Sequence, residues 1–578
     1  MLTIKRKIAE KIFDEVVKIN PAAELSADSI AEMLEYPPDT SMGDLAFPCF
    51  KLSRALRRSP VQIASTISES LKDDCIEHAE AVNGYLNIRI ANKYLGDNVL
   101  FEIIEKKESY GSPVSMGEGK TVVLDYSSPN VAKPFHIGHL GTTVIGHALK
   151  KLHEFAGYKC IGINYLGDWG TQFGKLIVAY RLWGNKEQIE EGGIDKLVEL
   201  YVRINNTIKG DEENGIPARD DLAQQARDEF KKMEMGDEEN IALWKWFVQI
   251  SLDEYEKTYK QLGIEFDSYK GESFYTDKMP AQVEKIREMG LMKIDDGASI
   301  VDLEQYGMPP CLILKRDGST LYPTRDIAAA VYRKEHYNFD KAIYVTSTQQ
   351  ILHFKQWFKV VELMGYDWYE GLVHVPYGTV SLNGAKLATR TGNVVLLKDL
   401  FALAIEKVTA IMEEKNPDLK GREDIAEAVG VGAIVFYYLT NNRIKDINFV
   451  LEEALSFDGN TGPYVQYTYA RACSLLEKAG KVEYKNIKIT CDEEAELVKT
   501  LSQFEEKVRV AIRDYEPSVI ARYILDIAAA FNKFYHSCQI LSAADEDVKA
   551  TRIMLTEATK YVLGSAFELI CLKKTERI

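Results

Sequence analysis

Hydrophobic periodicity divides the chain into helical and strand-like stretches. Near the start, Ile4, Ile8, Ile12 and Val16 recur at helical spacing, which predicts an amphipathic helix. The stretch that follows mixes helix with short strand patterns such as GYLNIRI, and it ends at a linker containing Gly, Ser and Pro. We therefore expect an N-terminal α+β domain over residues 1–112.

A second unit begins with TVVLDYS, a short apolar run of the kind buried in parallel sheets. Apolar or small residues then recur on one helical face over 137–152, which predicts a helix with one buried side. The run KCIGINYLGDWG supplies a second strand that ends in glycines. Strand, helix and strand in this order predict a doubly wound, parallel, nucleotide-binding sheet.

The remaining pattern predicts an insertion followed by helices. Residues from about 185 to 290 are strongly charged and mainly helical in pattern, and they interrupt the sheet. Strand patterns return at CLILKRDG and KAIYVTST, so we expect the sheet-containing domain over 113–400. Beyond it the pattern is almost wholly helical. We expect a connecting segment over 401–456 and an all-helical C-terminal domain over 457–578.

The charge balance limits the partners that this chain can bind. Lys and Arg total 71 against 87 Asp and Glu, and the net charge of −16 argues against indiscriminate binding to nucleic acid phosphates. Residues 461–578 contain 17 basic and 17 acidic residues, so a shaped polyanion meets less repulsion at that end.

Other sequence features indicate the compartment. The eight cysteines are scattered without a CxxC pair, which favours free thiols in a reducing compartment over disulfides or structural zinc. The first residues mix acids and bases, unlike a signal peptide, and no apolar run approaches the ~18 residues of a membrane span. We expect a cytoplasmic protein with no membrane association.

The stretch SSPNVAKPFHIGHLG is the first candidate for chemistry. His136 and His139 lie three residues apart on the first turn of the expected helix, where the helix dipole favours an anion. Gly138 lets a phosphate come close, and Pro134 suits a helix entry. We interpret this as a site for ATP phosphates; the alternative is two histidines that only cap the helix. A metal site is not expected, because no third ligand accompanies the pair.

Two further candidates carry polar groups. On the glycine-flanked loop GAKLATRTGNVV, Lys386 and Arg390 are placed to stabilise a pentavalent phosphate and departing pyrophosphate, although loop cations are usually only solvated. A set of carboxylate, amide and phenol groups is expected at strand ends, and such groups suit a planar cation such as guanidinium. This set is Asp125, Asn130, Tyr322, Asp326 and Gln350.

Two members of this set have additional requirements. Asp125 lies inside an apolar strand and needs a partner, because an unpaired buried carboxylate is costly. Asp326 has an alternative role as the N-cap of the helix IAAAVYRKE.

The tyrosines and arginines of the C-terminal helices are suited to stacking on unpaired bases, although aromatic stripes at helical spacing more often belong to a core.

Together these motifs resemble one family. HIGH at 136–139 matches the first signature of class I aminoacyl-tRNA synthetases, and KLATR at 386–390 resembles a variant of their second, the KMSKS loop. Four more motifs resemble the arginyl-tRNA synthetase family: SSPNVAKPFHIGH, GDWGTQFG, YPTRD and FDGNTGPYVQYTYAR.

This resemblance implies a multidomain α/β protein. Its Rossmann-type catalytic domain carries the insertion, its C-terminal helical domain binds the anticodon, and its N-terminal domain touches the tRNA elbow. By position, Asp125, Asn130, Tyr322, Asp326 and Gln350 would hold L-arginine. The ATP-binding residues would be His136, Gly138, His139 and Lys386. Tyr85 and Asn87 would contact a base of the tRNA D-loop.

The resemblance also implies the partners and two open points. The substrates would be L-arginine, its tRNA and ATP with Mg²⁺, and we expect a monomer. Thr389 replaces the second signature lysine, so Lys386 or Arg390 must supply more of the charge. The ending LKKTERI departs from the usual ending of the family, which puts a terminal contact with tRNA in doubt.

Overall fold

The computed structural model describes residues 1–210, 217–382, 385–386 and 395–578. An N-terminal unit comes first and packs helices on a three-stranded antiparallel sheet of order β1-β3-β2. Its elements are α1 (Leu2–Ile19), α2 (Ala27–Met33), β1 (Leu45–Pro48), α3 (Ser53–Leu56), α4 (Pro60–Ser70), β2 (Ile76–Val82) and β3 (Tyr85–Ile90). The α1 face that contains Ile4, Ile8, Ile12 and Val16 is buried, which confirms the predicted amphipathic helix.

A helical passage leads from this unit into a parallel sheet. The passage consists of α5 (Asn92–Tyr94), η3 (Leu95–Leu100) and α6 (Phe101–Lys106). The sheet has four parallel strands in the order β10-β9-β4-β5. Its strands are β4 (Thr121–Asp125), β5 (Lys159–Ile163), β9 (Lys341–Ser347) and β10 (Leu372–Tyr377), and the associated helices are α7 (Leu140–Phe155), α13 (Tyr322–Tyr337) and α14 (Ile351–Leu363).

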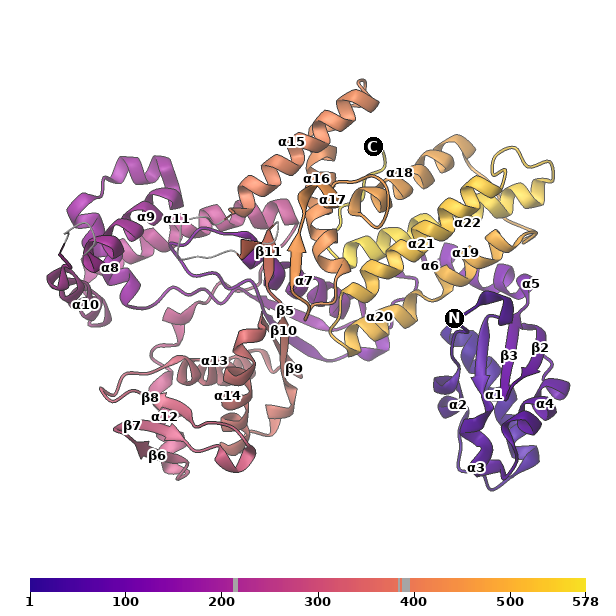
Figure 1. Ribbon diagram of the computed structural model, residues 1–578, viewed down its shortest axis with the longest axis horizontal. Coiled ribbons are helices and arrows are strands. Elements are labelled where there is room, and N and C mark those ends of the chain that lie inside the picture. The colour runs from indigo at the N-terminus through magenta and orange to yellow at the C-terminus, as the bar shows by residue number, and fades with distance from the viewer. Residues whose placement is uncertain (211–216, 383–384, 387–394) are drawn as a thin grey trace.

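Two groups of elements separate β5 from α13 (Figure 1). The first is helical: α8 (Thr171–Trp183), α9 (Lys186–Lys209), α10 (Asp220–Glu234) and α11 (Glu238–Leu262). The second contains α12 (Met279–Glu288), β6 (Met292–Asp295), β7 (Ala298–Val301) and β8 (Cys311–Leu314). The strand CLILKRDG belongs to this second group, as β8 of an antiparallel sheet, and not to the parallel sheet.

The C-terminal part is almost wholly helical. Its short sheet has the order β12-β11-β13 and consists of β11 (Val380–Leu382), β12 (Ala385–Lys386) and β13 (Ile447–Phe449). The helices are α15 (Leu397–Lys415), α16 (Arg422–Thr440), α17 (Leu451–Ala454), α18 (Gly462–Ala479), α19 (Asp492–Ser502), α20 (Phe504–Arg513), α21 (Ser518–Ser537) and α22 (Glu546–Leu569). The three-part architecture confirms the predicted fold class. No described helix is both long and apolar enough to cross a bilayer.

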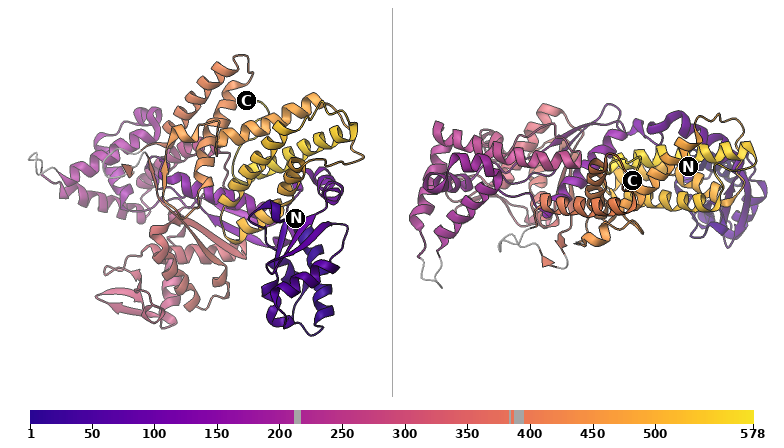
Figure 2. Two further views of the ribbon diagram at one scale, coloured as in Figure 1. Left: turned by 45° about the vertical axis from the view of Figure 1, so that its right-hand side comes forward. Right: turned by 90° about the horizontal axis from the view of Figure 1, so that it is seen from above.

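The two ends of the chain meet. The α1 side of the N-terminal unit lies against α19 and α20, and Figures 1 and 2 show this unit beside the C-terminal helices in every view. The Met1 ammonium group donates to the Ser502 carbonyl at 2.5 Å, and the Lys5 ammonium group pairs with Glu506 at 2.8 Å. The Asp44 carboxylate, whose side chain is 7% exposed, pairs with the Lys499 ammonium group at 2.7 Å. These ion pairs fix the N-terminal unit to the helical unit.

Candidate active site

The turn between β4 and α7 is strained. Three residues other than glycine have left-handed backbone angles: Ser127 at φ 69°, Ser128 at φ 47° and Ala132 at φ 57°. Each such residue costs about 1–3 kcal/mol and persists only where its surroundings hold it. The stretch SSPNVAKPFHIGHLG is therefore shaped by contacts from elsewhere in the fold.

Helix α11 supplies most of these contacts. Ser251 accepts the Ala132 amide at 3.1 Å, and the Tyr255 hydroxyl donates to the carbonyls of Asn130 at 2.9 Å and Lys133 at 2.7 Å. The Tyr259 hydroxyl lies 2.7 Å from the Ser127 hydroxyl. Helix α11 of the insertion thus supports the turn between β4 and α7.

The two histidines lie together at the start of the helix. Their ring centroids are 3.9 Å apart, and Phe135 stacks on His139 at 5.1 Å. The Gly138 amide donates to His136 Nδ1 at 3.0 Å, and the His136 amide donates to His139 Nδ1 at 3.2 Å. The capping alternative is therefore also true, because His136 is the N-cap of this turn.

These contacts determine what the histidines can donate. Since each Nδ1 accepts a hydrogen bond, each neutral ring carries its proton on Nε2 and offers that N–H outward. A Cβ at Gly138 would lie 2.7 Å from Cε1 of His136, so a side chain there would displace the ring. The arrangement can donate two neutral N–H groups to an oxyanion.

Burial keeps both rings neutral. It lowers the pKa of His136 to about 4 and that of His139 to about 3, and the nearby Lys133 ammonium group lowers both pKa values further. A histidine with a depressed pKa stabilises the folded state above the unfolded value of about 6.5. That stabilisation is lost as the pH falls from about 6.5 toward 4.

We expect no titration of either ring between pH 6 and 8 in the folded protein. Carbon-13 NMR of labelled histidine Cε1, assigned with His136→Gln and His139→Gln, checks this expectation. The same signals in urea should titrate near pH 6.5. A folded-state midpoint above pH 6 for either ring would contradict the neutral, Nε2-donating arrangement.

The chain that follows the second signature loop contacts the HIGH turn. Ile137 donates to the Val395 carbonyl at 3.2 Å, and His136 forms an isolated antiparallel bridge with Leu396. Of the predicted loop residues, Lys386 lies in β12, whose backbone pairs with β11. Its side chain and all of Arg390 and Thr389 lie outside the described residues. The chain after this loop is thus anchored on the HIGH turn.

The polar set predicted for the amino acid lies around the carboxyl edge of the sheet. Asp125 ends β4 and Asn130 follows it, while Gln350 follows β9 in a short 3-10 turn. Helix α13 directly precedes β9 in the chain and leads back to the start of that strand, so α13 itself begins at the carboxyl edge. Tyr322 is its first residue. Tyr322 is 67% exposed, and Asn130 and Gln350 are also exposed. Ligands of open α/β sheets bind at this edge.

Asp326 faces a partner that the sequence reasoning missed. Its Oδ2 atom lies 2.6 Å from His353 Nε2, and the two side chains are 20% and 25% exposed. The N-cap alternative for Asp326 is wrong, because α13 begins at Tyr322 with proline in its first turn. Asp326 instead lies one turn into the helix, on the same face as Tyr322.

Asp125 is fully engaged within the protein. Its Oδ2 atom pairs with the Arg333 guanidinium at 2.8 Å, and its Oδ1 atom accepts the Ser128 hydroxyl at 2.9 Å. The Arg333 side chain is 1% exposed. Burial raises the pKa of Asp125, and Arg333 and Ser128 oppose that shift. The predicted need for a partner is met by Arg333, which favours an indirect role for Asp125 at the site.

A third acid near the site is also paired with a cation. Glu272 pairs with the Arg325 guanidinium at 2.7 Å, and both side chains are largely buried. Burial raises the pKa of Glu272 to about 7, Arg325 lowers it and Asp326 raises it. Glu272, Arg333 and His353 were missed in the sequence. His353 could have been found, because it lies three residues after Gln350 at the start of the same helix.

The residues expected to contact RNA differ in exposure. Tyr85 is 36% exposed and packs edge-on against exposed Phe50 at 5.4 Å, whereas Asn87 on the same strand is only 8% exposed. In the C-terminal unit Arg471 lies over Tyr467 at 4.9 Å and over Tyr535 at 4.7 Å. Tyr467 is 43% exposed and the other two side chains are half-buried, and an aromatic and guanidinium cluster of this kind suits stacking on bases.

The unusual C-terminal ending is engaged with its own chain. Lys573 pairs with Glu427 at 3.3 Å, Lys574 with Glu568 at 2.6 Å and Arg577 with Glu477 at 2.9 Å. These cations are balanced by acids before any nucleic acid approaches. The ending is thus a weaker electrostatic attractor than its sequence suggests.

The parallel sheet, the HIGH turn and the polar edge define the catalytic domain of a class I aminoacyl-tRNA synthetase. A family model described as "tRNA synthetases class I (R), catalytic domain" matches residues 100–451. The "Arginyl tRNA synthetase N terminal domain" matches 3–90, and the "DALR anticodon binding domain" matches 465–578. The chain belongs to the arginyl-tRNA synthetase family.

Curated relatives and a solved structure of this family match the chain over nearly its whole length. An "Arginine--tRNA ligase" of Alkaliphilus metalliredigens is 47% identical over 582 residues, covering 100% of both chains. One of Clostridium perfringens is 46% identical and covers 99% of this chain and 100% of the other. The Thermus thermophilus arginyl-tRNA synthetase has a similar fold, with a TM-score of 0.83 at 24% identity over 99% of this chain and 100% of that one.

Proposed function

We propose that this chain activates L-arginine with ATP and transfers the arginyl group to the 3′-terminal ribose of its tRNA. The observation that carries the proposal is the pairing of two sites at one sheet edge. A neutral histidine pair offers N–H groups to phosphate, and the partly exposed carboxylate of Asp326 suits a guanidinium group.

The reaction has two steps. The arginine carboxylate attacks the α-phosphorus of ATP in line, which gives arginyl-adenylate and releases pyrophosphate. A terminal ribose hydroxyl of the tRNA, which we assign as the 2′-OH, then attacks the arginyl carbonyl and AMP leaves. The substrates supply both nucleophiles, so the protein acts by positioning and by stabilising charge.

Each predicted site residue has a role in this proposal. His136 and His139 donate their Nε2–H groups to the phosphates beside Gly138, and Lys386 and Arg390 add positive charge from the loop. Tyr322, Asp326 and Gln350 hold the arginine with Asn130, and Asp125, paired with Arg333, ends β4 at the same edge of the sheet. Lysine is disfavoured because an ammonium group cannot fill the two-pronged contact of a guanidinium.

Magnesium is assigned as part of the ATP substrate. Among the described residues, groups of three or more possible metal ligands occur at Cys491, Glu494 and Cys538 and at Asp73, Asp74 and Cys75. Neither group lies in the catalytic unit. Mg²⁺ would therefore arrive with ATP, largely hydrated.

The tRNA would span the two outer units. We propose that Tyr85 and Asn87 contact its elbow and that the helical unit binds its anticodon, with tRNA binding completing the active site. We propose domain boundaries of 1–112, 113–400, 401–456 and 457–578, with the insertion at about 185–290. We also propose that the enzyme works as a monomer, because one chain contains all of these units, and that it works in the cytoplasm, where its eight free cysteines would stay reduced.

Exchange of labelled pyrophosphate into ATP tests the proposal. Measured with each amino acid, with and without tRNA, it should depend on arginine and be strongest when tRNA is present. Absence of exchange with every amino acid would indicate a binding protein. Exchange with another amino acid would indicate a different adenylating enzyme.

Replacing His136 by Ala should lower the rate of pyrophosphate exchange by roughly 10- to 100-fold, because a hydrogen bond to a charged phosphate is worth about 1.5–3 kcal/mol. The KM for arginine should change little. His153→Ala is the matched control, since His153 is buried at the far end of α7. Exchange kinetics unchanged by His136→Ala would remove this residue from the ATP site.

A further inference from the structure

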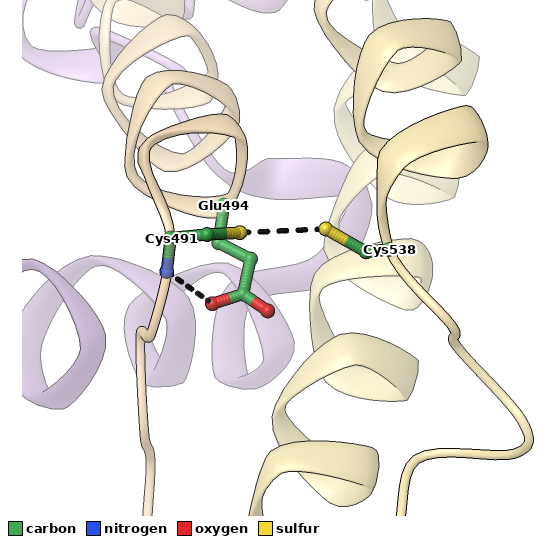
Figure 3. A group of neighbouring side chains, drawn as sticks. All are labelled: Cys491, Glu494 and Cys538. Atoms are coloured by element: carbon green, nitrogen blue, oxygen red, sulfur yellow. Dashed lines mark hydrogen bonds between the residues drawn. The ribbon is translucent and has the colours of Figure 1, made fainter.

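Two thiols of the helical unit face each other. Cys491 is the N-cap of α19 and Cys538 follows the last residue of α21, and Figure 3 shows their sulfur atoms pointing at one another. The sulfur atoms are 3.4 Å apart. Cys491 is half-buried and Cys538 is 8% exposed. All eight cysteines lie in the described part of the chain, and this is their one sulfur–sulfur contact.

The neighbouring carboxylate is not available as a metal ligand. Glu494 is buried, and its Oε2 atom accepts the amides of Thr490 at 2.6 Å and Cys491 at 3.3 Å. Its Oε1 atom accepts Arg552 Nε at 2.6 Å. The carboxylate is thus saturated by donors and neutralised by a cation. Two thiols alone do not complete the four ligands of a structural zinc site.

Little movement is needed to join the thiols. A disulfide needs its sulfur atoms about 2.05 Å apart, so side-chain rotation and a small backbone adjustment suffice. Cys491 immediately precedes α19 and Cys538 immediately follows α21. The chain is less constrained at such helix termini than inside a helix. The geometry therefore favours a covalent bond over a bound metal.

We propose that Cys491 and Cys538 are a site of oxidative modification, where a hydroperoxide converts the dithiol into a reversible disulfide that ties α19 to α21. The proposal is independent of the catalytic roles assigned above. Its chemistry needs no group from the active site, and it involves a part of the chain matched by the anticodon-binding family model.

The chemistry balances with hydrogen peroxide as the oxidant. The thiol of the more exposed Cys491 first loses its proton to solvent. Its thiolate attacks a peroxide oxygen, the O–O bond breaks, and a sulfenic acid and a hydroxide form; the hydroxide takes up a proton from solvent and becomes the first water. The sulfur of Cys538 then attacks the sulfenic sulfur, and the S–O bond breaks. The departing hydroxide takes the Cys538 proton and leaves as a second water.

The surroundings make the first step slow at neutral pH. Burial raises the pKa of Cys538 to about 12 and also raises that of Cys491. Hydrogen bonds involving Glu494 and Cys538 oppose the rise in the pKa of Cys491, and Arg552 opposes the rise in the pKa of Cys538. Since only the thiolate reacts, disulfide formation should be about tenfold faster at pH 8.5 than at pH 7.5.

Peptide mapping of the full-length protein after treatment with excess hydrogen peroxide tests the proposal. The peptides of Cys491 and Cys538 should appear linked, with two hydrogen atoms fewer, and dithiothreitol should separate them. Cys491→Ser and Cys538→Ser should abolish the link. Cys473→Ser, which replaces a half-buried thiol on α18 of the same unit, should leave it intact.

Thermal unfolding supplies a second measurement. Closing this loop should raise the unfolding temperature of the helical unit by on the order of 5 °C in wild type, reversibly, and in neither serine variant. The proposal fails if the pair stays reduced while other thiols oxidise. It also fails if the link forms without a rise in unfolding temperature, or if both thiols hold stoichiometric zinc in the purified enzyme.

Discussion

Asp326→Asn should lower kcat/KM for arginine by about 100- to 1000-fold, because removing one charge of a hydrogen-bonded charge pair costs about 2–5 kcal/mol. The Asn side chain has nearly the same shape and can still contact His353, so the fold should be unchanged. The measurement is aminoacylation of tRNA over a range of arginine concentrations, together with circular dichroism.

A neighbouring acid provides the matched control for this variant. Glu335 lies on the same helix, α13, and is exposed, so Glu335→Gln changes the net charge equally without touching the proposed site. It should keep near-normal kinetics. Near-normal arginylation by Asp326→Asn would remove Asp326 from the arginine site, and equal losses in both variants would indicate a general charge effect.

Arg333→Met should destabilise the parallel sheet by about 3–5 kcal/mol, because it leaves the Asp125 carboxylate buried without its cation. A chain of several domains does not unfold in a single step, so hydrogen exchange of the β4 amides is the suitable measurement. Protection of these amides should fall by at least 100-fold.

The same ion pair supplies a rescue experiment and a pH dependence. Asp125→Asn in the Arg333→Met background should recover at least half of the lost protection, because no charge remains to be buried. In the single variant the pKa of Asp125 rises, so the folded state holds a proton that the unfolded chain releases. The loss of stability should therefore grow from pH 5 to pH 8. A pH-independent loss without rescue would mean that Arg333 acts only through packing.

Much of the fold could be predicted because periodicity reports burial. The apolar stripe of α1 and the strand, helix and strand order around TVVLDYS are local patterns, and each stretch formed the predicted element. The strand CLILKRDG shows the limit of this reasoning. A strand pattern does not reveal which sheet receives it, and this one joins an antiparallel sheet through β7.

The site could be predicted in its residue types but not in its pairings. Arg333 stands in the charged run YRKEH, which resembles a solvated helix end, yet tertiary packing buries it against Asp125. Its spacing of seven from Asp326 was the available signal, because two helical turns return to the same face. His353 lies close to Gln350 in the sequence, but its pairing with Asp326 depends on how α13 and α14 pack, which no local pattern encodes. The assignments of individual residues to arginine, ATP and tRNA remain predictions.

The brace from α11 changes how loss-of-function variants in the insertion should be interpreted. The supporting residues lie more than 100 residues after the turn, in an insertion that looks peripheral to the catalytic sheet. They are Ser251, Tyr255 and Tyr259. A screen that sorts variants by sequence distance from HIGH would classify changes at these positions as harmless or as simple folding defects. Such variants should instead show the kinetic signature of a damaged nucleotide site in an otherwise folded enzyme. The set of residues whose substitution should impair the nucleotide site therefore includes residues of the insertion.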